Sequence, residues 1–396
     1  MSILPAIVTP KAVNSFIVRN FVAPNLHMLF FVTVFVMAGI TAQFLTVPLY
    51  IQAPIVLAVC ILMVIINKMR RGTYYYAILP LSFALGSFLC YKQQEVQKKF
   101  TQEFTGHTIT VHATVCNIEE IQSNPRFKNR ITVSTYQIKK DAVPLAHQDH
   151  TLSLYVRRAP ADLLVGDVIE ITDLIGKEIK KSSFGTYLAK EKISATLFLD
   201  TFTYTLLNRP EFSIVRSLFY LRNALFYSLR NKINKATFTL FSSIFLGNRT
   251  AVKNQIEKDK ESFKIWGISH HLARSGLHLV IFAMLWHFIL NILPIAFLAR
   301  QFLFVTLVLL YALLSWSSIS FERALLMLIF YKLTLFIKTP LHYIHLITLV
   351  TLLVLLFNPL QLFFLDFQLS FGLTFALAWF SAIEWRKNRH AGANIL

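Results

Sequence analysis

The sequence predicts a polytopic α-helical membrane protein with a small all-β domain inserted into it. Its 396 residues are 55% hydrophobic and only 15% charged, whereas soluble domains average about 25% charged residues. Long apolar runs occupy both ends of the chain. Between them, apolar and polar residues alternate with the two-residue period of β-strands.

The first 91 residues predict an N-terminal membrane anchor of three helices. Each of its apolar runs approaches the ~20 residues needed to cross a hydrocarbon core. The runs lie near residues 26–47, 50–66 and 74–90. A loop with Lys68, Arg70 and Arg71 separates the last two, and the positive-inside rule places this loop and the N-terminus in the cytoplasm. The chain therefore leaves the membrane on the outer side after Tyr91.

Residues 92–205 predict the extracytoplasmic β domain. Five runs have strand character: "TITVHATVCNI", "RITVSTYQI", "TLSLYVRR", "GDVIEITDLIG" and "ISATLFLDTFTY". Short strands separated by polar turns are typical of a small barrel or sandwich. The stretch 92–210 has 16 basic against 13 acidic residues, so we expect at most modest affinity for a polyanion.

Residues 206–264 predict an interfacial helical region. In "FSIVRSLFYLRNALFYSLRNKI" arginines alternate with aromatic residues, which favours an amphipathic helix on the membrane surface. Phe219, Tyr220 and Tyr227 either anchor this helix at the interface or stack on nucleic-acid bases. The net charge of +19 also has two explanations. Membrane proteins carry an excess of Lys and Arg in cytoplasmic loops, and a polyanionic partner would require the same excess.

Residues 265–396 predict a membrane core of about five helices. The spans lie near residues 270–293, 301–318, 322–337, 341–357 and 361–383. Five crossings that start outside end in the cytoplasm, where the cationic segment "EWRKNRH" follows. The whole chain then has about eight spans with both termini inside.

The segment "HHLARSGLHLVIF" is unusually polar for the start of a span. Its polar and small members are His270, His271, Arg274, Ser275, Gly276 and His278. On a helix, His271, Ser275 and His278 share one face, and His270 and Arg274 form an adjoining pair. An ionisable residue at a span centre costs about 2.5–3.5 kcal/mol, so such residues usually face a bundle interior or an aqueous cavity.

Three other interpretations of this segment stay open. It is a solvated helix end, a nucleophilic site formed by Ser275 and His271, or a metal site that lacks a suitably spaced third ligand. The chain has no zinc-type cysteine spacing and no Walker A motif. The sequence therefore predicts no metal, no cofactor and no motor of its own.

Two further polar clusters interrupt apolar sequence. "FERALLM" carries Glu322 and Arg323, and "FFLDFQLSFGL" carries Asp366, Gln368 and Ser370. Asp366 and Ser370 have helical i, i+4 spacing, so we expect them on one face. There they either line a pore or form a polar clamp between helices.

Taken in order, "SSIFLGNRTAV", "GISHHLARSGLHLVIF", "FERALLM" and "NPLQLFFLDFQLSFGL" resemble the motifs of the ComEC family of competence DNA-uptake channels. The resemblance covers roughly residues 30–385, and residues 92–200 resemble the family's outer OB-like domain. The family pattern falls on Gly247, Arg249, His271, Ser275, Gly276, His278, Arg323, Gln368, Leu369 and Ser370, with Asp366 beside the last motif. Asn248, Arg274 and Asn358 depart from it, replacing the usual Asp, an apolar residue and Asp.

The resemblance implies uptake of single-stranded DNA through a bacterial inner membrane during natural transformation. His270, His271, Arg274, Ser275, Gly276, His278, Arg323, Gln368 and Ser370 would then line the DNA path. The implied partners are single-stranded DNA, the bilayer, a separate nuclease, a DNA receptor, a cytoplasmic helicase and a possible second copy of the chain. No H-x-H-x-D-H motif of the family's metallo-β-lactamase-like domain is present, so no catalytic residue is predicted. The alternatives are a membrane hydrolase and a degenerate relative that no longer transports.

Overall fold

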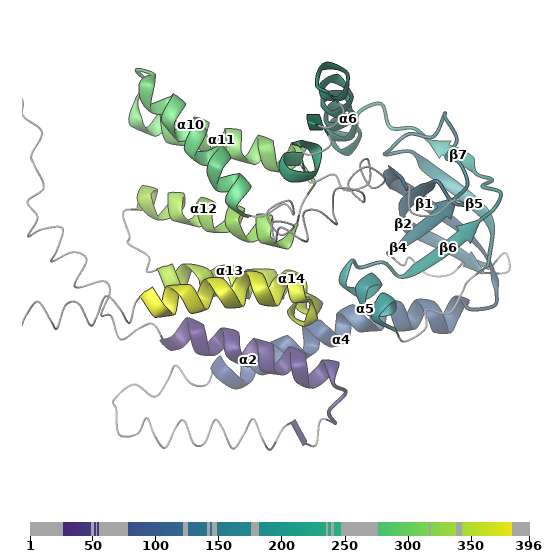
Figure 1. Ribbon diagram of the computed structural model, residues 1–396. Helices are drawn as coiled ribbons and strands as arrows, with labels where there is room; N and C mark the ends of the chain where they lie inside the picture. Colours follow the sequence, from purple (N-terminus) through teal and green to yellow (C-terminus); the bar gives the residue numbers. More distant parts are fainter. Residues whose placement is uncertain are drawn as a thin grey trace, which may run out of the picture. The chain divides into compact units, whose positions relative to one another are not determined.

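The computed structural model describes residues 27–48, 51–52, 54, 78–121, 126–140, 143–144, 149–175, 182–234, 237–238, 241–246, 276–316, 318–337 and 343–381. The chain divides into two compact units. Figure 1 shows the helices and strands that they contain. One contains residues 1–91 and 323–396, and the other contains residues 92–322. The chain is mostly helical, with one small mixed sheet in the second unit.

The sheet consists of five long strands and two short ones. They are β1 Thr108–Glu120, β2 Asn129–Lys140, β3 Val143–Pro144, β4 His150–Val156, β5 Val168–Ile175, β6 Ala195–Leu199 and β7 Thr205–Asn208. The strand order is β6-β4-β2-β1-β5-β7, with β3 beside β2. The β4–β6 pair is parallel and the other pairs are antiparallel. Each of the five predicted runs coincides with one long strand.

Alternating residues of the strands form the core of the sheet domain. In β1, Ile109, Val111, Ala113 and Val115 are fully buried, as the sequence pattern predicts. Helix α4 (Ile78–Phe104) covers residues 78–90 of the third predicted span and continues to Phe104, whose ring is also fully buried in this core. Burial of these apolar faces is the main stabilising term of the domain.

The prediction of an all-β domain is wrong, because helix α5 (Ser183–Lys190) lies between β5 and β6. The Ser182 side chain caps its first turn by accepting a hydrogen bond from the Gly185 N–H. Gln93 of α4 donates to the Ala189 carbonyl at 2.8 Å, and Gln97 of α4 donates to the Ile193 carbonyl at 2.9 Å. The first bond satisfies a carbonyl in the last turn of α5 and the second a carbonyl of the segment that follows it, so both attach this part of the chain to α4.

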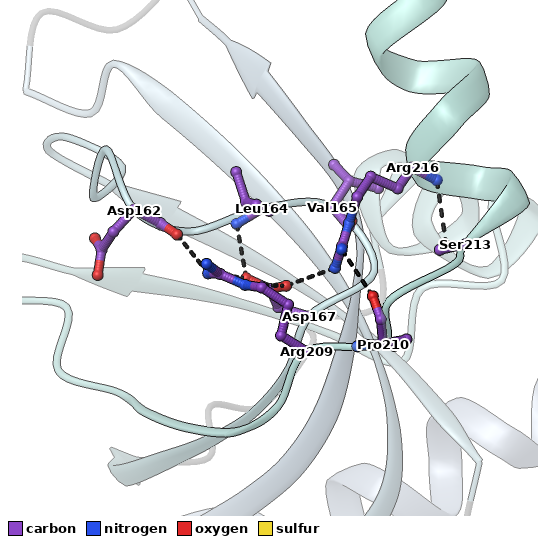
Figure 2. A network of polar contacts seen from close by, with 8 residues as sticks. All are labelled: Asp162, Leu164, Val165, Asp167, Arg209, Pro210, Ser213 and Arg216. Carbon is purple, nitrogen blue, oxygen red and sulfur yellow. Dashed lines mark hydrogen bonds and ion pairs between the residues drawn. The ribbon is translucent and has the colours of Figure 1, made fainter.

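Helix α6 (Ile214–Lys232) follows the sheet and is fastened to it by the buried carboxylate of Asp167 (Figure 2). Arg209 binds both oxygens of this carboxylate, at 3.0 and 2.7 Å, and Arg216 of α6 binds it at 2.7 Å. Arg216 also donates to the carbonyls of Val165 and Pro210. The side chain of Asp167 has no exposed surface, so α6 begins on a fully buried carboxylate.

Helices α10 (Gly276–Ile292) and α11 (Phe297–Leu314) complete the second unit. They pack against each other through stacked rings of Phe282 and Tyr311, whose centroids are 4.1 Å apart. A π-type turn, η3 (Ser242–Leu246), precedes them in sequence.

The first unit contains α2, part of α4, most of α12, and the helices that follow. Their bounds are α2 His27–Phe44, α12 Ile319–Ile337, α13 Tyr343–Phe357, η5 Pro359–Phe363, α14 Leu365–Phe367 and η6 Gln368–Gly372, followed by helix 373–381. At the crossing of α2 and α4, a Cβ at Gly39 or Gly86 would collide with the backbone of the other helix. Small residues that allow such close approach are typical of membrane helix pairs.

The predicted spans are described unevenly by the structure. Within the described residues, α11 alone is long and apolar enough to cross a membrane, with shorter apolar helices at Leu29–Phe44, Gly276–Ile292 and Tyr343–Phe357. The predicted span 361–383 is not one regular helix, because a 3-10 turn and the π-type turn η6 interrupt it. Most of the span 50–66, and residues 270–275 of the fourth span, lie outside the described residues. The eight-span topology stays a prediction.

Candidate functional site

Seven of the predicted site residues lie outside the described part of the chain. They are Gly247, Asn248, Arg249, His270, His271, Arg274 and Ser275. The structure does describe the segments that flank them, as well as Gly276, His278 and the two later clusters. The geometry of these neighbours indicates which motifs lie together.

The segment before Gly247 packs on the start of α10. The ring of His278, in the first turn of α10, meets the ring of Phe245 edge-on at 5.6 Å and is only 7% exposed. The Tyr311 hydroxyl donates to the Phe245 carbonyl at 2.7 Å, and the Trp316 N–H donates to the Leu246 carbonyl at 2.8 Å. The first two motifs therefore meet at one place, and His278 is a buried residue rather than part of a solvated helix end.

The third and fourth motifs meet in the first unit. Arg323 donates from Nη1 to the backbone carbonyl of Ser370, and its guanidinium carbon lies 5.7 Å from the centre of the Phe371 ring. The Thr374 hydroxyl donates to the same carbonyl at 2.6 Å. Ser370 belongs to η6, and π-type turns of this kind are frequent at functional sites.

Two polar atoms of this pair have no partner among the described residues. They are the Nε of Arg323 and the hydroxyl oxygen of Ser370, and both are inaccessible to solvent. Leaving such groups unsatisfied costs free energy, so each orphaned group calls for an explanation.

The prediction that Asp366 and Ser370 share one helix face stays a prediction. Asp366 lies in the three-residue α14 and is exposed, with one carboxylate oxygen accepting from the Phe367 N–H at 3.0 Å. The π-type turn η6 begins at Gln368, between the two residues, and the hydroxyl oxygen of Ser370 is inaccessible to solvent. Gln368 is exposed as well and donates to the Leu362 carbonyl at 2.9 Å.

Residues 244–395 match a family model described as competence protein. This part of the chain is a competence-protein domain. The match contains all four motifs, from the "FLGNR" segment to "FQLSF", so the resemblance to the ComEC family is confirmed. It supports a role in competence and DNA uptake. Comparison with curated proteins and with solved structures gave no match.

Helices α10 and α11 of the competence domain carry a large exposed apolar surface. On α10 it comprises Leu277, Val280, Ile281, Met284, Leu285, Phe288 and Ile292. On α11 it comprises Phe297, Leu298, Phe302, Leu303, Leu309, Leu310 and Leu313. Apolar patches of this extent mark contact with a membrane or with other proteins, which agrees with a membrane-associated competence domain.

Outside the competence domain, one face of the sheet carries an aromatic cluster that the sequence analysis missed. Tyr155 of β4 and Phe198 of β6 are directly paired, and their rings stack at 4.9 Å with an interplanar angle of 25°. Arg126 and Arg157 flank them, and both bind Asp200. The hydrogen bond from Arg126 is the main cause that lowers the pKa of the Asp200 carboxyl. Two cations on one carboxylate leave the cluster net positive.

Metal chemistry finds no support in the part of the chain that the structure describes. There, no three or more His, Cys, Asp or Glu side chains come together in a way that could hold a metal ion. The polar groups that do come together near the motifs are cations, hydroxyls and backbone carbonyls. Such groups bind and orient a ligand.

Proposed function

We propose that the chain is an inner-membrane channel that passes single-stranded DNA into a bacterial cell during natural transformation. The observation that carries this proposal is the pairwise meeting of competence motifs, at Phe245 with His278 and at Arg323 with Ser370. A polyanion in a low-dielectric region needs cations and hydrogen-bond donors along its path. The Arg323 guanidinium supplies a cation where the last two motifs meet.

Uptake of labelled DNA tests the assignment of His278 to the DNA path. His278→Ala removes a buried ring, whereas His287→Ala removes an exposed histidine of the same helix that also meets an aromatic edge, that of Phe304 at 5.9 Å. At equal membrane abundance, we expect His278→Ala to lower internalised DNA at least tenfold while surface binding persists. Equal uptake by the two variants would remove His278 from the path.

The same cells test the runner-up functions. A serine-directed covalent probe should leave Ser275 unlabelled if the chain is a channel, and labelling would favour the hydrolase alternative. A degenerate relative would show no dependence of DNA uptake on the chain at all. We therefore include a deletion strain, which the proposal predicts to be transformation-deficient.

We further propose that the sheet domain is OB-like and binds single-stranded DNA on the Tyr155–Phe198 face. The five long strands, with β1 paired to both β2 and β5 and with a parallel β4–β6 pair, support a small, partly open barrel of this class. Base stacking on an aromatic residue contributes about 1–3 kcal/mol. Phe198→Ala should thus weaken binding of an oligothymidylate about tenfold. Phe184→Ala, which removes an exposed stacked ring on α5, should not.

The proposed topology places the sheet domain outside and both termini in the cytoplasm. Cys116 of β1 is an exposed free thiol, whereas Cys90 is buried. Partial burial raises the pKa of the Cys116 thiol, so labelling needs a mildly alkaline buffer. A membrane-impermeant maleimide should label Cys116 in intact spheroplasts and not label Cys116→Ser. Labelling that requires lysis would place the domain inside.

The proposed channel works with a DNA receptor, a separate nuclease and a cytoplasmic helicase. A second copy of the chain is a further candidate partner. The chain itself has no Walker A motif, so an external motor fits. Crosslinking in competent cells, followed by mass spectrometry, identifies these partners.

A further inference from the structure

A cavity of about 270 Å³ lies in the second unit between α6, η3, α10 and α11. Its lining is apolar along almost its whole surface and includes Leu225 and Phe226 of α6, Phe282 of α10, and Leu310 of α11. The volume is slightly below the ~300–1,000 Å³ range of small-molecule sites. It therefore fits a slender apolar group.

Among the described residues, Arg222 of α6 is the one charged side chain that lines this cavity. Its guanidinium stacks on the Trp316 ring at 4.4 Å, which leaves the edge of the guanidinium free to donate. Its Nε is inaccessible to solvent and has no hydrogen-bond partner among the described residues. A half-buried cation with an unused donor is complementary to an anion.

The cavity is polar at one end, where Arg222 lies, and apolar along the rest of its wall. Leu307, Leu310 and Leu314 lie on successive turns of α11, and Trp316 follows directly after the end of that helix. Since α11 has the length and composition of a membrane span, Trp316 and Arg222 belong at the level where interfacial aromatics and headgroups meet. The leucines then extend from that level towards the acyl region.

We propose that this cavity binds one acyl chain of an anionic phospholipid, whose phosphate contacts Arg222. A free phosphate would use the arginine and leave the apolar cavity empty. A nucleobase would need polar partners that the lining lacks. A phospholipid satisfies both ends at once. The site goes beyond DNA transport and does not depend on it, because it would hold α6 against α10 and α11 whether or not DNA passes.

Native mass spectrometry of the purified full-length chain tests the site. Protein is released from nanodiscs of phosphatidylglycerol or of phosphatidylcholine with the same acyl chains, and retained lipid is counted. The wild type should retain one phosphatidylglycerol and about tenfold less phosphatidylcholine, as expected for a charge-assisted contact. Arg222→Gln should lose that lipid about tenfold. Arg230→Gln removes an exposed cation of the same helix and should retain it.

A second variant tests the apolar end without changing charge. Leu310→Trp adds a large ring at an exposed edge of the cavity and should also lower lipid retention about tenfold, with unchanged helicity. Equal retention by Arg222→Gln and Arg230→Gln, or equal retention of the two lipids by the wild type, would overturn the proposal. So would competition by an oligothymidylate for the bound lipid, since that outcome would assign the cavity to nucleic acid.

Discussion

Replacing Asp167 by Asn isolates the role of charge in the ion cluster of Figure 2. The carboxylate accepts hydrogen bonds from Arg209, Arg216 and the Leu164 N–H, and its side chain is fully buried. Asparagine has the same size but no charge, and it directs an NH₂ group at an arginine. Two cations then remain beside each other without the carboxylate that both of them bind.

The structure sets the size of the effect. Breaking a buried ion pair from one side costs about 3–5 kcal/mol. Arg209 has a side chain that is 40% exposed and can rehydrate, whereas that of Arg216 is only 14% exposed. We therefore expect the lower end of the range, about 3 kcal/mol, which corresponds to a more than hundredfold change in a local opening equilibrium.

Hydrogen–deuterium exchange of the purified full-length chain measures this opening. Peptides from β5 and from the first turns of α6 should exchange more than a hundredfold faster in Asp167→Asn, because α6 loses its attachment to the sheet. Arg157→Gln removes an ion pair whose side chains are 59% and 47% exposed, and it should leave the exchange of these peptides almost unchanged. If the two variants exchange alike, the cluster does not fasten α6.

Three further predictions concern other elements. Burial lowers the pKa of His150, so the unfolded chain binds the proton more readily than the folded chain. The sheet domain should therefore lose stability as pH falls below about 6.5. Between pH 7.5 and about 5.5, the melting temperature should fall more in the wild type than in His150→Gln, and equal losses would contradict this. Gly86→Ala places a Cβ against the Val36 carbonyl and should lower the melting temperature by several degrees. In the control Gly372→Ala the added Cβ meets no atom within 4 Å, so the melting temperature should not change. Equal melting temperatures of the two variants would refute the close crossing of α2 and α4. Arg323→Lys keeps the charge but loses the planar fork, so we expect about 1–2 kcal/mol lower stability and reduced DNA uptake, and wild-type values in both assays would show that the geometry of the guanidinium is unimportant.

The strands of the sheet could be predicted because side-chain periodicity alone determines which face is buried. Ile109, Val111, Ala113 and Val115 alternate with polar residues, and only a pleated strand puts all four on one side. The parallel β4–β6 pairing could not be predicted in this way, since it depends on the path of the chain between the strands. Helix α5 carried only a serine cap as its local signal, and its glutamine partners come from α4, about ninety residues earlier.

The site could be predicted only where chemistry, rather than spacing, was the signal. Arg323 and Ser370 were singled out as polar residues in apolar sequence, and the structure joins them. The sequence analysis assumed a regular α-helix here, whereas a π-type turn begins at Gln368, between Asp366 and Ser370. No side-chain pattern in "FQLSFG" predicts that turn. The stacked Tyr155–Phe198 pair was missed since it joins two strands that are distant in sequence.

The two π-type turns of the described chain, η3 and η6, are stabilised in the same way. Each lies at a competence motif: η3 ends directly before Gly247, and η6 contains Gln368 and Ser370. In each, donors from another segment bind the backbone carbonyls, Tyr311 and Trp316 in η3 and Arg323 in η6. A widened turn is costly unless its carbonyls are satisfied in this way. Both turns therefore depend on neighbouring helices, so a shift of those helices would change the backbone at the motifs.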